Sequence, residues 1–291
     1  MIKFTVVTCT YNAAPFLQRT LDSVRHQSYS EVEHLIIDGL SKDDTIRLAL
    51  DYKQRSDGSG NGHEVNIISE KDNGLYDAMN KGIRHATGTY IVFLNAGDTF
   101  PTSEILETVA ASVGEGEALP GVLYGDTNIV SESGFVLHPR RLRPPKRLTW
   151  RSFKWGMLVC HQAFYARTDL AKQTPYNLNY HFSADVDWCI RIMKACAANH
   201  LALRNVGEVV ANYLNEGMTG RNHKASLKER FDVMAKHYGW LQTVLLHGWF
   251  AVRAIIRYHR VSIWFWCSGR PGAGHQPPVL MDCLPGGSRT K

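Results

Sequence analysis

Polar side chains that could hold a nucleotide or a metal ion follow four β-rich runs in the first hundred residues. In chain order they are Thr10, Tyr11 and Asn12, then Asp38, then Asp72, then Asn95 and Asp98. Carboxylates at three successive run ends would concentrate negative charge unless a cation or a ligand rich in N–H donors offset it. The pattern therefore predicts a site for a metal ion, for a ligand with N–H groups, or for both.

Alternating strands and helices would have to position these residues. The expected strands cover residues 4–8, 34–38, 65–69 and 90–94, and the expected helices cover residues 14–26, 45–55 and 75–86. This order is typical of an α/β protein with a mostly parallel sheet flanked by helices. Ligands of such sheets bind beyond the carboxyl ends of the strands, so the polar residues should meet at one edge. A helix cap is the alternative role for any one of the aspartates taken alone.

The composition is that of a folded globular protein, with 44% hydrophobic and 21% charged residues in a chain of 291. No run approaches the roughly 20 apolar residues of a membrane-spanning helix. The N-terminus lacks the pattern of a secretory signal, and the six cysteines show no zinc-ligand spacing. We therefore expect a cytoplasmic protein with unpaired thiols.

The net charge of +6 is unevenly spread, and residues 139–154 carry basic side chains with no acidic one among them. Such a stretch favours an anionic partner, such as nucleic acid, a diphosphate or acidic lipid, or is simply a solvated face. The sequence has no helix-turn-helix, zinc-finger or RNA-binding motif, so we expect no nucleic-acid partner. TCTYNA, in place of GxGxxG, follows the first expected strand, which excludes a dinucleotide-binding dehydrogenase.

The C-terminal part differs in composition from the rest. Residues 223–268 are predicted to be a helical extension, in which aromatic residues alternate with Arg253, Arg257 and Arg260. A basic, aromatic amphipathic helix can lie on an anionic membrane surface, and packing against the preceding domain is the alternative. Residues 269–291 are rich in Pro and Gly and are predicted to be an unstructured tail.

Three stretches carry a resemblance to a known family: VVTCTYNAAPFLQRTLDSVRHQSY, LIIDGLSKDDT and SEKDNGLYDAMNKGIRHATGTYIVFLNAGD. They resemble the nucleotide-binding half of family 2 glycosyltransferases, which have the GT-A fold, a Rossmann-like arrangement. The words EKDNGLYDAMNKG are similar to those of bacterial enzymes that assemble colanic acid and O-antigen polysaccharides. The resemblance covers residues 3–100 densely and residues 155–220 loosely. It implies a catalytic domain over residues 1–222, with a nucleotide-sugar half (1–100) and an acceptor half (101–222).

Asp98 is the metal ligand that this resemblance implies. In the family an Asp-x-Asp motif follows the fourth strand, whereas Asn95 stands at the first acidic position here and only Asp98 remains. Mn²⁺ or Mg²⁺ prefers oxygen ligands and can take one or two carboxylates, while phosphates and water supply the rest. We expect Asp98 at a loop edge, where it takes no part in core packing.

The nucleotide sugar, a UDP-sugar, would be held by the other strand-end residues. In the family the Asp after the second strand accepts the imide N–H of uracil and the Tyr of the first loop stacks on the base, roles that fall here to Asp38 and Tyr11. Further donor contacts are expected from Thr10, Asn12, Asp72, Asn80 and Asn95. For Asn80, packing and solvent contact are the alternatives.

The catalytic base is expected in the second half. The words HFSADVDW resemble the family's Glu-Asp motif, which places the base on Asp185 and puts Ala184 where the family has Glu. An inverting transfer needs one carboxylate to take the acceptor's proton, and a helix cap is the alternative role for Asp185. Asp187 is the second choice for the base, and Asp187, His161 and Gln162 are expected to contact the acceptor.

These features predict an inverting glycosyltransferase that moves a hexose or N-acetylhexosamine from a UDP-sugar to a hydroxyl of a lipid-linked saccharide. The expected setting is surface polysaccharide biosynthesis, with the protein peripheral at the inner face of the cell membrane. A non-catalytic nucleotide-sugar-binding protein of the same fold is the alternative, because Asn95 and Ala184 replace acidic residues of the family.

Overall fold

The computed structural model describes residues 1–114, 118–215 and 223–267, with side chains described through residue 253 except at 223 and 224. In its first part strands and helices alternate as the sequence predicts: β1 (Phe4–Thr10), α1 (Ala14–Arg25), β2 (Val32–Asp38), α2 (Thr45–Asp57), β3 (Glu64–Ser69), α3 (Leu75–His85) and β4 (Tyr90–Phe93). β1 runs two residues further than expected, because Thr10 still pairs in register with Asp38 of β2. Thr10 is therefore a strand residue and not a loop residue.

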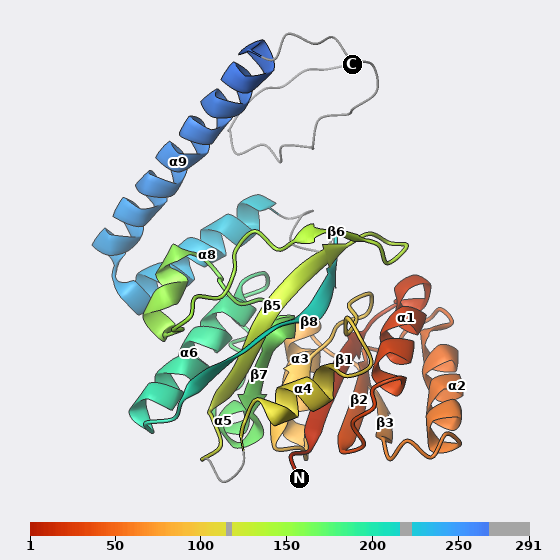
Figure 1. Cartoon of the computed structure of the whole chain (residues 1–291). Coiled ribbons are helices and arrows are strands. Elements are labelled where there is room, and N and C mark those ends of the chain that lie inside the picture. The colour runs from red at the N-terminus through yellow and green to blue at the C-terminus, as the bar shows by residue number, and fades with distance from the viewer. Residues whose placement is uncertain (115–117, 216–222, 268–291) are drawn as a thin grey trace. The chain divides into compact units, whose positions relative to one another are not determined.

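The second part is less regular. Its described elements are α4 (Ile105–Ala111), β5 (Val122–Val130), β6 (Val136–Pro139), the 3-10 helices η1 (Trp150–Trp155) and η2 (His161–Ala163), β7 (Phe164–Arg167), α5 (Thr168–Gln173), α6 (Ala184–Ala198), β8 (Leu203–Leu214), α8 (His223–Tyr238) and α9 (Trp240–Cys267). Among the described residues the strands form one mixed sheet in the order β3-β2-β1-β4-β7-β5-β6, and β8 pairs with β5. β3, β2, β1 and β4 are mutually parallel, while β7 runs antiparallel to β4. The predicted α/β fold with a mostly parallel sheet is confirmed (Figure 1).

Helices cover both faces of the parallel strands. α1 and α2 share a small apolar cluster with one face of β2, in which Leu17 and Tyr52 surround Ile36. α3 belongs to the larger core on the other face. It lies close to β1 because Gly82 has no side chain: a Cβ there would come within 2.5 Å of a methyl carbon of Val7. Because α3 follows the carboxyl end of β3, its N-terminal half lies at the carboxyl edge of the sheet, where the expected site lies.

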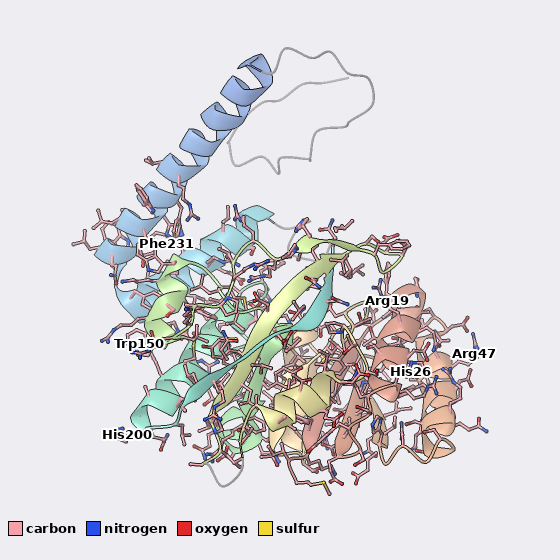
Figure 2. All side chains as sticks on the ribbon, viewed as in Figure 1. Arg19, His26, Arg47, Trp150, His200 and Phe231 are labelled. Carbon is pink, nitrogen blue, oxygen red and sulfur yellow. The ribbon has the colours of Figure 1, made fainter. Side chains whose placement is uncertain are left out.

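The described chain divides into two compact units, Met1–Val244 and a second that starts at Leu245. α8 belongs to the first unit. Trp150 of η1 lies beside it (Figure 2), where its ring stacks on Tyr238 with centroids 5.8 Å apart and the Tyr238 hydroxyl donates to the Trp150 carbonyl at 2.6 Å. The C-terminal helices expected from the sequence are present as α8 and α9. The predicted tail over residues 269–291 lies outside the described residues.

Within the part of the chain that the structure describes, no helix combines the length and the hydropathy needed to cross a membrane. Over residues 240–253, where its side chains are described, α9 nevertheless has exposed apolar side chains. They are Trp240, Leu241, Val244, Leu245, Trp249 and Val252. Because these positions recur at three- and four-residue steps, they form one stripe along the helix.

Candidate active site

The carboxyl ends of β1, β2 and β3 meet at Asp38. Its side chain is fully buried. One carboxylate oxygen accepts hydrogen bonds from the hydroxyls of Thr10 (3.0 Å) and Ser41. The other accepts from the Ser41 backbone N–H (3.0 Å) and the Ser69 hydroxyl (2.8 Å). Asp38 thus joins the three strand ends, and it can accept a ligand's N–H only if one of these hydroxyl protons turns away.

The first loop presents Tyr11 to solvent. Its side chain is 63% exposed beyond the end of β1, so a ring face is available for stacking. Asn12, which has a positive φ of 49°, is fixed on the β2 side: its backbone N–H donates to Ser41 and its side-chain oxygen accepts the N–H of Lys42, both at 2.8 Å. The two side chains therefore differ, since Tyr11 is free to contact a ligand whereas Asn12 holds the loop.

Asp72 reaches the same edge from the loop after β3. Its carboxylate packs against Gly39, where a Cβ would come within 2.4 Å of a carboxylate oxygen. The other carboxylate oxygen accepts the Gly74 backbone N–H at 2.9 Å. Glycine at position 39 is required for this approach, so Asp72 lies directly beside the residue that follows Asp38.

Asp98 is buried, with 4% of its surface exposed, and the expectation of a loop-edge residue without core packing is wrong. One carboxylate oxygen accepts from the Gln162 side-chain amide at 2.8 Å, and the other accepts from the backbone N–H of Leu214, the last residue of β8, at 2.9 Å. Burial raises the pKa of Asp98 to about 6, against the hydrogen bonds from Leu214 and Gln162, which lower it. The residue ties the loop after β4 to both η2 and β8.

Asn95 and His161 connect the Asp98 loop to α6. The Asn95 side-chain nitrogen lies 3.3 Å from Nε2 of His161, whose Nδ1 lies 3.4 Å from a carboxylate oxygen of Asp185. The other carboxylate oxygen of Asp185 faces the Tyr76 hydroxyl at 3.4 Å and accepts the Val186 N–H at 2.9 Å. A chain of side chains therefore runs from the end of β4 to the first turn of α6.

Asp185 keeps part of its surface open, with 17% of the side chain exposed. Burial raises its pKa, but the hydrogen bond and charge of His161, together with Arg230, outweigh burial and hold the pKa below the usual range. Asp185 is therefore ionised at neutral pH and has an oxygen that a new donor can approach. An ionised carboxylate within hydrogen-bond reach of a hydroxyl can act as a general base.

The side-chain oxygens of Asn95 and Asp98 suit a hard divalent cation. The side-chain oxygen of Asn95 is buried and has no hydrogen-bond partner among the described residues, and an amide oxygen is a ligand that Mg²⁺ and Mn²⁺ accept. Asp98 supplies a carboxylate in the same loop, three residues on. No cluster of three or more His, Cys, Asp or Glu side chains able to hold a metal occurs among the described residues, so phosphates and water would have to complete the coordination.

The structure gives other roles to three of the predicted contacts. The Asn80 side chain is buried and brackets the backbone of Tyr176, donating to its carbonyl at 3.0 Å and accepting its N–H at 2.7 Å. Asp187 is fully buried and lies among Arg191 of α6 and Lys236 and His237 of α8. Neither side chain faces a ligand in this arrangement. Gln162 is also buried, and its side-chain amide orients Asp98.

Sequence reasoning missed Tyr76 and Glu229. Tyr76 is buried on α3, and its ring stacks on Tyr176 with centroids 5.5 Å apart, while its hydroxyl faces Asp185. Glu229 of α8 accepts three backbone N–H groups that precede α6. Tyr76 lies in the segment GLYDAMNKG, which carries the family resemblance, so this segment was a signal that could have identified it. No local signal marks Glu229, because its partners lie nearly 50 residues away.

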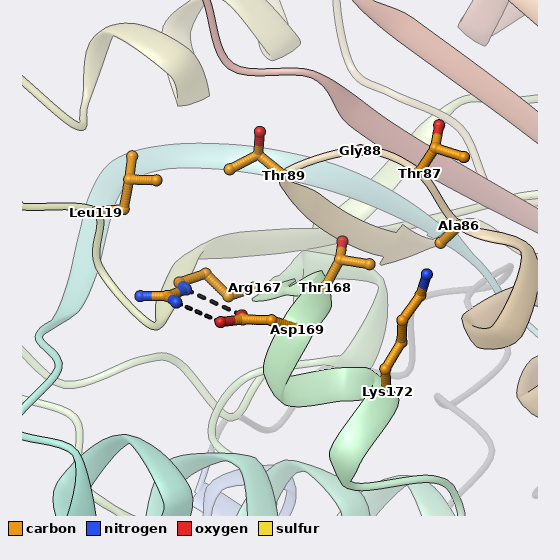
Figure 3. Close-up of a pocket in the computed structure, with 9 residues that line it drawn as sticks. All are labelled: Ala86, Thr87, Gly88, Thr89, Leu119, Arg167, Thr168, Asp169 and Lys172. Atoms are coloured by element: carbon orange, nitrogen blue, oxygen red, sulfur yellow. Dashed lines mark hydrogen bonds and ion pairs between the residues drawn. The ribbon is translucent and has the colours of Figure 1, made fainter.

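A separate hollow of about 550 Å³ lies at the opposite, amino end of β4 (Figure 3). It is lined by Thr87, Thr89 and Lys172, among others, and the Arg167 guanidinium on its wall is paired with Asp169. None of the predicted site residues lines it. The chemistry-bearing residues therefore gather at the carboxyl edge of the sheet and not at this hollow.

Comparison with known proteins gives a family match over most of this edge. The family model described as glycosyl transferase family 2 matches residues 5–173, which is more than half of the chain. The match contains Tyr11, Asp38 and Asp98 and ends before α6, so Asp185 lies outside it.

Two relatives resemble the chain over most of its length. A PGL/p-HBAD biosynthesis glycosyltransferase of Mycobacterium tuberculosis is 33% identical over 223 residues, which cover 72% of this chain and 76% of the relative. The amylovoran biosynthesis glycosyltransferase AmsB of Erwinia amylovora is 27% identical over 236 residues, which cover 77% and 73%.

Two solved structures are similar in fold. S. aureus TarS 1–349 in complex with UDP-GlcNAc has a TM-score of 0.60 at 15% identity, covering 84% of this chain and 70% of that one. The mannosyltransferase PcManGT of Pyrobaculum calidifontis, in complex with GDP-Man and Mn²⁺, has a TM-score of 0.56 at 16% identity, covering 89% and 80%. At these identities the likeness shows the fold alone.

Proposed function

This chain belongs to glycosyl transferase family 2 and is a glycosyltransferase, and from that premise we propose that it moves a hexose or N-acetylhexosamine from a UDP-sugar to a hydroxyl of a saccharide, with inversion. The observation that carries the proposal is the continuous path from Asp98, through Gln162 and its neighbour His161, to Asp185. It supports the proposal because the residues proposed for the leaving group and for the base are linked through neighbouring residues of η2.

The nucleotide would lie over the ends of β1 and β2. The exposed ring of Tyr11 suits stacking on a base, and Asp38 suits the imide N–H of uracil once Ser41 or Ser69 turns its hydroxyl proton away. Thr10, Asn12 and Asp72 complete this edge, of which Thr10 and Asn12 act mainly by holding Asp38 and the loop. Support for a uridine nucleotide comes from the fold likeness to TarS, which was solved with UDP-GlcNAc.

Asp98 and the side-chain oxygen of Asn95, which has no hydrogen-bond partner in the described part of the chain, would hold a divalent cation, Mn²⁺ or Mg²⁺. When bound, such a cation neutralises the charge that develops on the departing diphosphate. The Gln162 side chain and the Leu214 N–H both donate to the Asp98 carboxylate, so this metal-ligating group is already oriented in the folded protein. The Mn²⁺ in the similar fold of PcManGT supports this choice of metal.

Asp185 would act as the base. It accepts the proton of the acceptor hydroxyl while that oxygen bonds to the anomeric carbon and UDP leaves, so a single displacement inverts the configuration. A transfer through a glycosyl-enzyme would need a nucleophilic carboxylate at the anomeric carbon, and retaining glycoside hydrolases hold two carboxylates close together for this purpose. The nearest candidate along the helix, Asp187, is fully buried against the cationic side chains of Arg191 and Lys236 and the His237 imidazole, which favours the inverting route.

The experiment is a nucleotide-release screen of UDP-, GDP- and dTDP-sugars with Mn²⁺ and a lipid-linked monosaccharide acceptor, run for the wild type and for Asp98→Asn. We expect transfer from a UDP-sugar that chelator abolishes, and loss of both transfer and Mn²⁺-dependent UDP binding in the variant. Circular dichroism checks folding, because Asp98 is buried. Chelator-insensitive transfer by Asp98→Asn would remove the metal assignment.

The acceptor is proposed to be a saccharide on a lipid carrier, used in surface polysaccharide biosynthesis at the inner face of the cell membrane. The named role of AmsB in amylovoran biosynthesis supports the polysaccharide part. The exposed apolar stripe of α9 supports attachment to an anionic membrane, together with Arg253 and the basic residues that follow it in the sequence.

Liposome co-sedimentation tests the attachment. Binding should require anionic lipid and disappear when residues 240–291 are deleted. It should fall at high salt, because ions screen the attraction between the lipid and the basic residues, each of which contributes about 1 kcal/mol. Intact protein that stays in the supernatant with anionic lipid would remove the membrane part and leave the transferase proposal standing. The non-catalytic alternative is not retained, because the chain belongs to a transferase family and an ionised, accessible Asp185 is present.

A further inference from the structure

Three consecutive backbone N–H groups before α6 converge on one side chain of α8. His181 donates to one oxygen of Glu229 at 2.8 Å, and Phe182 and Ser183 donate to the other at 2.7 and 3.0 Å. Ser183 is the residue at the N-terminal boundary of α6, and its hydroxyl adds a bond to the Ser226 carbonyl of α8 at 3.3 Å. The Ser183 N–H, at the helix start, has no partner inside the helix, and Glu229 of α8 supplies one for it and for the two residues before it.

The segment held in this way leads directly into the proposed base. Asp185 follows Ser183 by two residues, in the first turn of α6. On the far side of Asp185, Asp187 bonds to Lys236 and His237, which also belong to α8. The backbone of the base is therefore held by α8 both before and after it.

The side chain of Asp185 itself is held more loosely. Its contacts with the side chains of His161 and Tyr76 are both 3.4 Å long, and its one shorter bond, 2.9 Å from the Val186 N–H, comes from the backbone of α6 itself. The three bonds to Glu229 are 2.7 to 3.0 Å long. The position of the carboxylate thus depends chiefly on where the backbone places it. A general base must lie within hydrogen-bond reach of the proton it takes, and a displacement of about 1 Å can cost roughly 10²-fold in rate.

We propose that Glu229 is a positioning residue of the transfer reaction: it fixes the start of α6 so that Asp185 reaches the acceptor hydroxyl. The proposal rests on the role of Asp185 as the base. Glu229 touches neither substrate nor cation in this account, because its two oxygens are occupied by the backbone N–H groups. It also brings α8, which lies beyond the residues matched by the family, into the catalytic machinery.

Glu229→Gln is the variant that tests the proposal. The amide keeps the size of the side chain but replaces one acceptor oxygen with a donor group, which then faces a backbone N–H. The matched control is Glu33→Gln. Glu33 is a buried carboxylate at the amino end of β2 that likewise accepts three hydrogen bonds, from the Thr5 hydroxyl and from the N–H and hydroxyl of Thr87.

We expect Glu229→Gln to lower kcat by about 10- to 100-fold while the KM for the UDP-sugar changes less than twofold. Glu33→Gln should lose a similar or larger part of its thermal stability and keep the wild-type kcat. Hydrogen exchange at the backbone N–H groups of residues 181–183 should accelerate in Glu229→Gln only. If Glu229→Gln does not fold, Glu229→Asp, which keeps both acceptor oxygens on a shorter stem, takes its place with the same expected split between kcat and KM.

Two results are kept apart by including Asp185→Asn in the same assay. If Asp185→Asn loses transfer while the Glu229 variant matches Glu33→Gln in kcat at equal stability, the positioning role is overturned and the base assignment survives. If Asp185→Asn retains full transfer, the base assignment fails, and with it the premise on which Glu229 was placed.

Discussion

Two aspartates in the first turn of α6, two residues apart, have opposite surroundings. Asp187 is fully buried and lies 2.6 Å from Arg191, 2.9 Å from His237 and 3.3 Å from Lys236. Asp185 is partly exposed, and its nearest side-chain partners lie at 3.4 Å. Two steps along a helix turn the side chain by about 200°, so one carboxylate faces α8 and the other faces the carboxyl edge of the sheet.

The pKa values of Asp185 and Asp187 are both lowered, but the two carboxylates have different roles. Burial raises the pKa of both groups, but His237 with Arg191 overcomes it at Asp187 and His161 overcomes it at Asp185. Both are therefore ionised at neutral pH. The Asp187 carboxylate is paired with side chains of α6 and α8 and holds these two helices together. Asp185 retains an oxygen that can accept a further hydrogen bond. Exposure and contact length, and not ionisation, distinguish the candidate base.

The largest expected effect is on the turnover of Asp185→Asn. The amide cannot take the acceptor's proton, and general base catalysis contributes roughly 10²–10⁴-fold. We expect kcat to fall by a factor in that range, with a smaller loss of melting temperature than in Asp187→Asn and with unchanged binding of UDP. Initial rates of UDP release and a UDP titration measure the two quantities. A larger loss of turnover in Asp187→Asn than in Asp185→Asn would reverse the assignment of the two carboxylates.

Asp187→Asn should act on stability instead. Removing one partner of a buried ion pair costs roughly 3–5 kcal/mol, and we expect the low end of that range because Arg191 and Lys236 reach solvent. Chemical denaturation measures the free energy of unfolding. Below its melting temperature the variant should keep kcat within about tenfold of the wild type. A stability equal to that of the wild type would mean that the Asp187 cluster contributes no net free energy.

Much of this arrangement follows from the sequence. The alternation of strands and helices in the first hundred residues was predictable, because each element has its own hydrophobic period and the strand-end positions of Asp38 and Asp98 follow from it. The roles of Asn80 and Asp187 were not, since their partners are the Tyr176 backbone and two side chains of α8. Contacts of that kind depend on how distant segments pack, which no local pattern encodes.

The stability difference between the wild type and Asp187→Asn should depend on pH in one direction. The folded-state pKa of Asp187 is lowered from 3.8, so its contribution is present above that value and is lost as the pH falls below it. Arg191 of α6 and Lys236 and His237 of α8 face the carboxylate throughout. The melting temperatures of the wild type and of Asp187→Asn are measured at pH 7 and at pH 3. The difference between the two proteins should be smaller at pH 3. An equal or larger difference at pH 3 would contradict the ionised cluster.

The smallest effect concerns Tyr76, whose hydroxyl faces Asp185 from α3. A typical hydrogen bond contributes roughly 0.5–1.5 kcal/mol, and at 3.4 Å this one belongs at the weak end. Tyr76→Phe keeps the ring that stacks on Tyr176, so we expect kcat to fall only about two- to fivefold. Tyr176→Phe is the matched control, because its buried hydroxyl has no hydrogen-bond partner among the described residues and its loss should leave kcat unchanged. If kcat falls more than about 100-fold in Tyr76→Phe and not in the control, the position of Asp185 depends mainly on its own side-chain partners. The hydrogen bonds from the backbone of residues 181–183 to Glu229 of α8 would then be of secondary importance.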